Sequence, residues 1–194
     1  MNVVFMGTPD FSVGTLEEII KAGHTVSAVV TQPDKPKGRG GAVAMSPVKE
    51  VALKNGLTVL QPVKASNPEF VEELRGYNPD VIVVVAFGQL LPKAIIDMPK
   101  YGCINVHASL LPKYRGASPI QWAVIDDCEY SGVTTMQMNE GLDTGDILLV
   151  EKVKLDKKET AGSLFDKLSE VGAKLLVDTL KQKEAGTIKP VVQN

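Results

Sequence analysis

The chain of 194 residues carries 21 Lys and Arg against 23 Asp and Glu, and 44% of its residues are hydrophobic. The net charge of −2 excludes a globally basic nucleic-acid-binding surface, and the apolar content suffices for the core of one globular domain. No apolar run is long enough to span a bilayer and no signal-peptide pattern opens the chain, so we expect a cytoplasmic protein without membrane contact. Cys103 and Cys128 lack metal-ligand spacing, so we expect reduced thiols and no metal site.

Strand and helix patterns alternate through the first 125 residues. Short β-branched runs predict the strands, and Ser, Asn, Pro and Gly mark the helix boundaries. In chain order the elements are a strand at 3–6, a helix capped by Ser12 and closed by Gly23, a strand at 25–31, a helix from Ser46-Pro47 to Asn55-Gly56, a helix from Asn67-Pro68 to Arg75, strands at 80–86 and 104–107, and a helix from Ser118-Pro119. This order predicts a doubly wound α/β fold with a mostly parallel, Rossmann-like sheet and helices on both faces.

The rhythm changes after residue 130. Residues 133–138 and 147–155 predict two longer strands, which we expect to be antiparallel because a short loop joins them. A long helix follows, opened by Thr160 and closed by Gly186.

Asn105-Val106-His107 lies at the carboxyl end of a predicted strand, where open parallel sheets bind their ligands. Side chains alternate along a strand, so Asn105 and His107 share one face at a spacing of about 7 Å. An amide that can donate to an oxyanion and an imidazole that can carry a proton would flank one space. Taken alone, a histidine satisfied by hydrogen bonds in a surface loop would be the more ordinary interpretation.

A second polar segment runs from Gly141 to Ile147 and holds two glycines and two aspartates in six residues. Such a tight loop could fix a carboxylate, and Asp143 is the candidate. An ordinary turn aspartate that bonds its own backbone is the alternative. Together, Asn105, His107 and Asp143 would form a proton-transfer site.

Three segments together resemble one enzyme family: residues 102–112 (GCINVHASLLP), residues 114–116 (YRG) and residues 142–147 (LDTGDI). This long, ordered pattern is similar to that of the formyltransferases that use 10-formyltetrahydrofolate as formyl-donor co-substrate. The resemblance implies Asn105, His107 and Asp143 as catalytic residues in an acyl transfer to an amine that needs no metal. It also implies a pocket for the pterin of the folate, lined by Phe87, Gly88, Leu90, Leu91, Ser109, Leu110, Leu111, Pro112 and Asp143. The ordinary alternative for the four leucines is packing of loop residues against the core.

Nucleotide cofactors fit the sequence poorly. The segment after the first strand, 7–14, lacks the G-x-G-x-x-G spacing, and Pro9 removes a backbone donor that a pyrophosphate would use. No G-x-x-x-x-G-K-[ST] motif is present either, which argues against an ATP-using kinase or ligase.

The segment 32–41 is rich in Pro and Gly and carries Lys35, Lys37 and Arg39, which predicts an exposed, mobile, basic loop. A solvated insertion without a partner is the ordinary interpretation. The segment nevertheless resembles the loop of those formyltransferases whose acceptor is initiator methionyl-tRNA, and Arg115 would add a further tRNA contact. We therefore expect formylation of the α-amine of methionyl initiator tRNA, in support of translation initiation.

The resemblance implies that residues 1–194 form a formyltransferase catalytic domain, and we expect the C-terminal tRNA-binding domain of the family to be absent from this chain. We expect a monomer. Two alternatives stay open. One keeps the chemistry and changes the acceptor to glycinamide ribonucleotide, a sugar-nucleotide amine or water. The other is a folate-binding module without catalysis.

Overall fold

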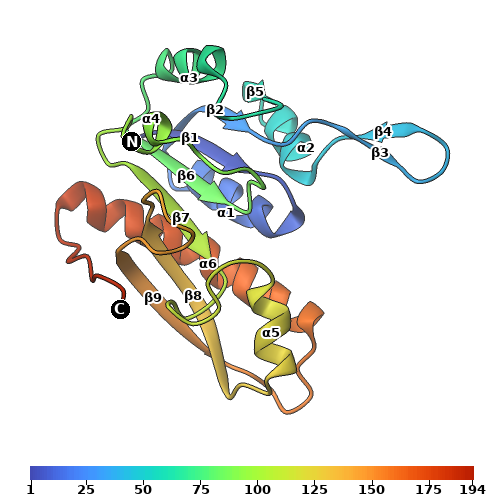
Figure 1. Ribbon diagram of the computed structural model, residues 1–194, viewed down its shortest axis with the longest axis vertical. Coiled ribbons are helices and arrows are strands. Elements are labelled where there is room, and N and C mark those ends of the chain that lie inside the picture. Colours follow the sequence, from blue (N-terminus) through green and yellow to red (C-terminus); the bar gives the residue numbers. More distant parts are fainter.

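A seven-stranded mixed sheet forms the centre of the computed structural model, which describes residues 1–194 (Figure 1). The strand order is β5-β2-β1-β6-β7-β8-β9; the first five strands are parallel, and β8 and β9 are each antiparallel to the preceding neighbour. The strands are β1 (Asn2–Gly7), β2 (Thr25–Val30), β5 (Val59–Leu60), β6 (Val81–Val85), β7 (Cys103–His107), β8 (Tyr130–Gln137) and β9 (Ile147–Lys154).

Helices cover both faces of this sheet, as the sequence predicts. They are α1 (Asp10–Lys21), α2 (Pro47–Lys54), α3 (Pro68–Arg75), α4 (Lys93–Ile96), α5 (Pro119–Ile125) and α6 (Ala161–Ala185). Buried side chains of α1, α2, α5 and α6 belong to one core cluster, and those of α3 and α4 belong to a second. Residues of β1 alternate between the two clusters, with Val3 and Phe5 in the first and Val4 and Met6 in the second. The doubly wound α/β prediction is therefore confirmed.

Three of the predicted helix starts have the capping contacts that the sequence suggests. The Ser46 hydroxyl accepts from the Lys49 amide at 3.1 Å, and the Asn67 side chain accepts from the Glu69 amide at 2.9 Å. Thr160 forms a reciprocal capping box with Ser163. Ser118 directly precedes α5 as predicted but makes no capping bond with its side chain.

The prediction that Ser12 caps the first helix is wrong. Helix α1 begins at Asp10 after Pro9, so Ser12 lies within its first turn. The Ser12 side chain is fully buried, and its hydroxyl donates to the Val85 carbonyl at the end of β6. A buried hydroxyl needs a partner, and here it ties the helix start to the central strand.

Residues 35–41 of the basic segment are exposed as predicted, whereas 32–34 are partly buried, and the segment is more ordered than the irregular loop that its composition suggests. Residues Lys35–Lys37 (β3) pair antiparallel with Ala42–Ala44 (β4), and the two strands form a hairpin that projects from the body of the molecule (Figure 1). Positive φ angles at Gly38 and Gly41 shape its turn. The sequence gives little sign of these strands because residues 35–37, Lys-Pro-Lys, lack the apolar alternation of a packed strand.

No helix of the structure combines the length and the apolar character needed to cross a bilayer, the 25-residue α6 included.

The two cysteines are free thiols with different surroundings, which predicts different reactivities. Cys103 is fully buried, and burial, together with the negative charge of Asp97, raises the pKa of its thiol to about 12. Because the thiolate is the reactive species, we expect a thiol reagent at neutral pH to modify only the partly exposed Cys128 in the native protein. Counting modified thiols before and after unfolding tests this. A Cys128→Ser variant that still reacts rapidly when folded would contradict it.

Candidate active site

One face of β7 changes from apolar to polar along the strand. It begins with Cys103, whose thiol lies 3.6 Å from the Ile95 carbonyl of α4, and continues with Asn105 and His107. The opposite face carries Ile104 and Val106, which lie in the core cluster that includes α6. Packing of Ile104 and Val106 in the core therefore fixes the position of the strand, and with it the positions of Asn105 and His107 on its other face.

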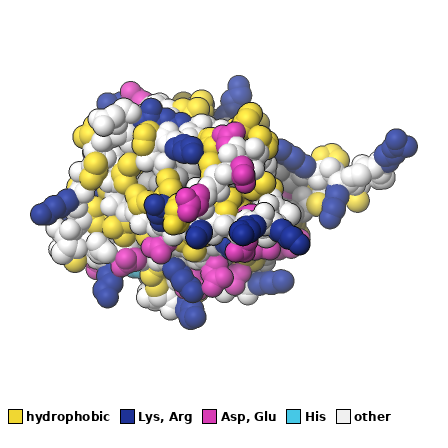
Figure 2. Space-filling view, turned by 90° about the horizontal axis from the view of Figure 1, so that it is seen from below, with side chains coloured by type: hydrophobic (Ala, Val, Ile, Leu, Met, Phe, Trp, Pro, Cys, Tyr) yellow, Lys and Arg dark blue, Asp and Glu magenta, His cyan; other side chains and the backbone are white.

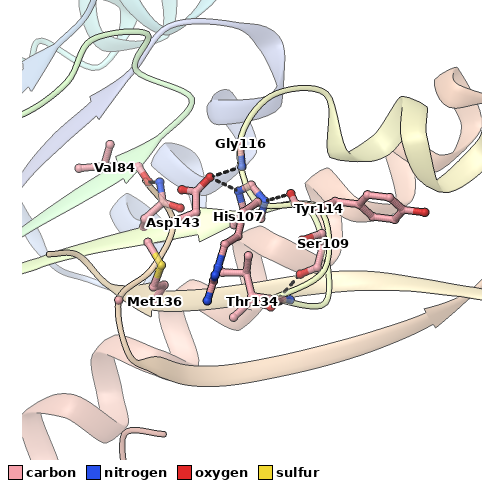
Figure 3. A network of polar contacts seen from close by, with 12 residues as sticks. Val84, His107, Ser109, Tyr114, Gly116, Thr134, Met136 and Asp143 are labelled. Atoms are coloured by element: carbon pink, nitrogen blue, oxygen red, sulfur yellow. Dashed lines mark hydrogen bonds and ion pairs between the residues drawn. The ribbon is translucent and has the colours of Figure 1, made fainter. Parts of the chain in front are cut away.

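His107 is held in one orientation and one tautomer. Its Nε2 lies 2.9 Å from the Tyr114 carbonyl oxygen, which can only accept, so Nε2 carries a proton and donates. The other nitrogen, Nδ1, faces the Asp143 carboxylate at 3.7 Å, as Figure 3 shows. The Nδ1 position is therefore the one at which the imidazole can take or give a proton.

Asp143 reaches His107 because the loop between β8 and β9 folds back. In the sheet, Gln137 at the end of β8 pairs with Ile104 near the start of β7, so this loop leaves from the other end of the strand that carries His107. Asp143 has a positive φ of 54°, and its carboxylate accepts a hydrogen bond from the Gly116 amide at 2.8 Å (Figure 3). At Gly145 a side chain would lie 1.7 Å from the Gln137 carbonyl oxygen, so this close turn requires glycine.

The site is partly enclosed. The side chains of His107 and Asp143 are 9% and 16% exposed. Enclosure weakens screening by water, so a charge on either side chain acts more strongly on its neighbour.

Asn105 has a polar atom without a partner. Its Nδ2 donates to the Val84 carbonyl at 3.0 Å, which leaves one N–H free, and its buried Oδ1 accepts from no group of the protein. Leaving a buried oxygen unpaired costs about 1–3 kcal/mol, and such groups occur where a ligand completes the hydrogen bonding. The amide of Asn105 therefore keeps one N–H and one oxygen without a hydrogen-bond partner in the protein.

A family model for formyl transferases matches residues 1–180.

The chain belongs to the formyltransferase family.

Relatives and folds agree with this family. The methionyl-tRNA formyltransferase of Lachnospira eligens is 75% identical over all 194 residues, and that of Agathobacter rectalis is 64% identical over the same length. This formyltransferase chain spans 62% and 63% of the length of those two proteins. In fold it is similar to glycinamide ribonucleotide transformylase 1 from Symbiobacterium toebii, with a TM-score of 0.83 at 16% identity, covering 100% of this chain and 94% of that one.

The residues that we expect to contact folate in this formyltransferase divide into two groups. Phe87, Ser109 and Leu111 are buried and support their loops from within. The remaining ones are partly or fully exposed: Gly88, Leu90, Leu91, Leu110, Pro112 and Asp143. Leu90 is 84% exposed, so its side chain is free to contact a flat ligand.

The residues that we expect to contact tRNA lie apart from one another. Lys35, Lys37 and Arg39 are exposed on the β3–β4 hairpin, and Figure 2 shows Lys and Arg side chains along this projecting arm. Arg115 is exposed as well, but it lies between Tyr114 and Gly116, whose main-chain groups bond His107 and Asp143, and it bonds the side chain of Gln193.

The base of the hairpin is braced by polar contacts. Asp34 accepts from Lys49 Nζ and from Gln61 Nε2, both at 2.8 Å. The hydrogen bond from Lys49 is the main reason why the pKa of Asp34 lies below its ordinary value. The arm therefore starts from a fixed point on the body of the formyltransferase.

Some groups that shape the site could not be inferred from the sequence. The Tyr114 carbonyl and the Gly116 amide act through the main chain, which no residue pattern reports, although both lie in the segment 114–116 that matches the family. Gln193 lies outside every motif, so no residue pattern marks it.

Proposed function

We propose that this formyltransferase moves the formyl group of 10-formyltetrahydrofolate to the α-amine of methionine esterified to initiator tRNA. The observation that carries the proposal is the enclosed group of Asn105, His107 and Asp143, with an unpaired Asn105 oxygen and an open His107 Nδ1. The choice of acceptor is supported by relatives at 75% and 64% identity that are named methionyl-tRNA formyltransferases.

The folate donor fits the residues around the site. Loops 87–91 and 109–112 follow β6 and β7, and the side chain of Leu90 is free to pack against a heterocycle. The Thr8 hydroxyl donates to the Phe87 carbonyl at 2.8 Å and so holds the first of these loops against the end of β1. The second N–H of the Asn105 amide, which bonds no group of the protein, is left for the reacting groups.

The side chains divide the chemistry among them. The amine must lose a proton as its nitrogen bonds the formyl carbon, and the Asp143 carboxylate accepts that proton directly or through water. The free N–H of Asn105 donates to the formyl oxygen as it gains negative charge. His107, protonated at Nδ1, supplies the proton for the folate nitrogen when its bond to the formyl carbon breaks. Asp143 faces that nitrogen of His107 and stabilises its protonated form.

The basic hairpin would add phosphate contacts for tRNA. Replacing Lys35, Lys37 and Arg39 together by alanine should raise the KM for methionyl-tRNA. It should also make kcat/KM less sensitive to salt: the negative slope of log(kcat/KM) against log salt should shrink in magnitude by about three, one for each lost contact. The kcat at saturating tRNA and the KM for the folate should stay unchanged, because the hairpin lies away from Asn105 and His107. Steady-state kinetics at several salt concentrations measures all three quantities.

A matched control removes the same charge elsewhere. Lys157, Lys158 and Lys181 are exposed outside the hairpin, and their replacement by alanine should leave the salt slope nearly as it was. Equal salt slopes for the two triple variants would contradict the role of the hairpin.

The acceptor is tested by competition. The chain is supplied with 10-formyltetrahydrofolate, methionyl initiator tRNA and glycinamide ribonucleotide together, and both formylated products are counted. The proposal predicts formylated methionyl-tRNA as the main product. Formylation of the ribonucleotide alone would overturn the acceptor, and release of formate alone would identify a hydrolase.

A further inference from the structure

The C-terminal tail returns from α6 to the catalytic loops. Val191 pairs with Ile147 at the start of β9 through two main-chain hydrogen bonds of 2.8 and 2.9 Å. Figure 1 shows the tail descending from the end of α6 to this edge of the sheet. Val191, Val192 and Asn194 are exposed, whereas Gln193 is partly buried. Of these four residues, only Gln193 turns its side chain toward the body of the protein.

The Gln193 side chain joins two loops by its two ends. Its Nε2 donates to the carbonyl oxygens of Asp143 and Gly145, at 3.0 and 2.7 Å. Its Oε1 accepts from the Arg115 guanidinium, at 3.1 Å from Nε and 2.9 Å from Nη2. The amide is thus fully used, with donors and acceptors matched at both ends.

Each of the two loops that Gln193 joins either carries a reacting side chain or bonds one through its main chain. The loop 114–116 supplies the Tyr114 carbonyl that fixes His107 and the Gly116 amide that holds the Asp143 carboxylate. The other loop carries Asp143 itself, in the left-handed region of backbone conformation. Arg115 lies between the two groups that hold His107 and Asp143, so anchoring Arg115 to the Asp143 loop fixes the spacing of the pair.

We propose that Gln193 is a positioning residue for formyl transfer, which sets the geometry of His107 and Asp143 by clamping loop 114–116 to loop 143–145. This inference rests on the proposed function. Gln193 touches neither substrate in this account. Its effect should therefore appear in the transfer step and leave donor binding intact.

Two substitutions at this position separate the two ends of the amide. Gln193→Ala removes both contacts and should slow single-turnover transfer by about 10–100-fold, as expected when catalytic groups are misplaced by a fraction of an ångström to about 1 Å. Gln193→Glu keeps an oxygen for Arg115 but sets carboxylate oxygens against two carbonyl oxygens, so it should be as slow as the alanine variant. The KM for 10-formyltetrahydrofolate should stay within about twofold in both, because no donor contact is lost.

A second readout does not depend on activity. The ¹⁵N resonances of the His107 imidazole report which ring nitrogen carries the proton. At a pH at which the imidazole is neutral, the native protein should show the Nε2–H form, and the Gln193→Ala variant should show a mixture because the Tyr114 carbonyl is no longer held in place. Asn194→Ala serves as the control, since the Asn194 side chain makes none of these contacts, and it should match the native protein in both readouts.

The outcomes separate this inference from the proposed function. Slow transfer by both Gln193 variants, with a mixed tautomer and an unchanged donor KM, supports the positioning role. Native rate and tautomer in Gln193→Ala would overturn it, and so would a Gln193→Glu variant as fast as the native protein. If the native chain transfers no formyl group to methionyl-tRNA, the proposed function fails, and the tautomer measurement alone then decides the role of Gln193.

Discussion

Replacing Asn105 by alanine should lower the single-turnover rate of formyl transfer by about 10²–10³-fold, the usual loss when one donor to an oxyanion is removed. The amide is the only side chain of the three whose free N–H can serve the formyl oxygen without first taking a proton. Donor binding should weaken far less than the rate, since the charge on that oxygen develops only in the transition state. Rapid-quench kinetics with saturating donor and methionyl-tRNA measures the rate.

Asn67→Ala provides a control of the same chemical type. This asparagine caps α3, so its loss should cost about 1 kcal/mol of stability while leaving the transfer rate unchanged. Near-native transfer by a folded Asn105→Ala variant would show that the amide is not the oxyanion donor.

The substitution Asp143→Asn should lower the transfer rate by about 10²–10⁴-fold, the range expected for loss of a general base. Asparagine can still accept the Gly116 amide, and it tolerates the positive φ that Asp143 adopts. The fold and the loop should therefore persist, while the carboxylate that takes the amine proton and faces His107 is lost. Thermal unfolding and single-turnover transfer, measured on the same preparation, separate the two effects.

Asp146→Asn is the matched control for charge. It removes a carboxylate from the same loop, and the Asp146 side chain bonds neither His107 nor Gly116. Its transfer rate should stay close to native. Equal losses in the two variants would mean that the net charge of the loop matters and that Asp143 has no special role.

Much of the fold follows from local patterns. Four of the five parallel strands, with most of their covering helices, could be predicted because buried strands read as apolar runs and Ser-Pro or Asn-Pro pairs mark helix starts. The antiparallel pair after residue 130 also follows, from two long strands and a short loop. The hairpin at Lys35–Ala44 could not be predicted, since its strands pack against nothing and carry no apolar alternation. Strand β5 and helix α4 escaped prediction because they are only two and four residues long.

The site divides in a similar way. Asn105 and His107 could be paired from the sequence because the two-residue spacing on a strand fixes their common face. Only the family resemblance predicted that Asp143 joins them. The loop that carries Asp143 leaves β8 beside the start of β7, whereas His107 lies at the end of β7. The tautomer of His107 depends on the Tyr114 carbonyl, a main-chain group, and Gln193 acts across 78 residues of sequence. Long-range and main-chain contacts of this kind leave no local pattern.

The most direct test of the site follows a labelled formyl group. 10-Formyltetrahydrofolate labelled in its formyl carbon is mixed with excess native chain and methionyl initiator tRNA, and the label is traced through a single turnover. The proposed function predicts that the label moves to the methionine amine as an acid-stable amide, and that Asn105→Ala and Asp143→Asn each slow this transfer by at least about 10²-fold. Label that stays on the bound folate, or that reaches the amine equally fast in all three proteins, would contradict it.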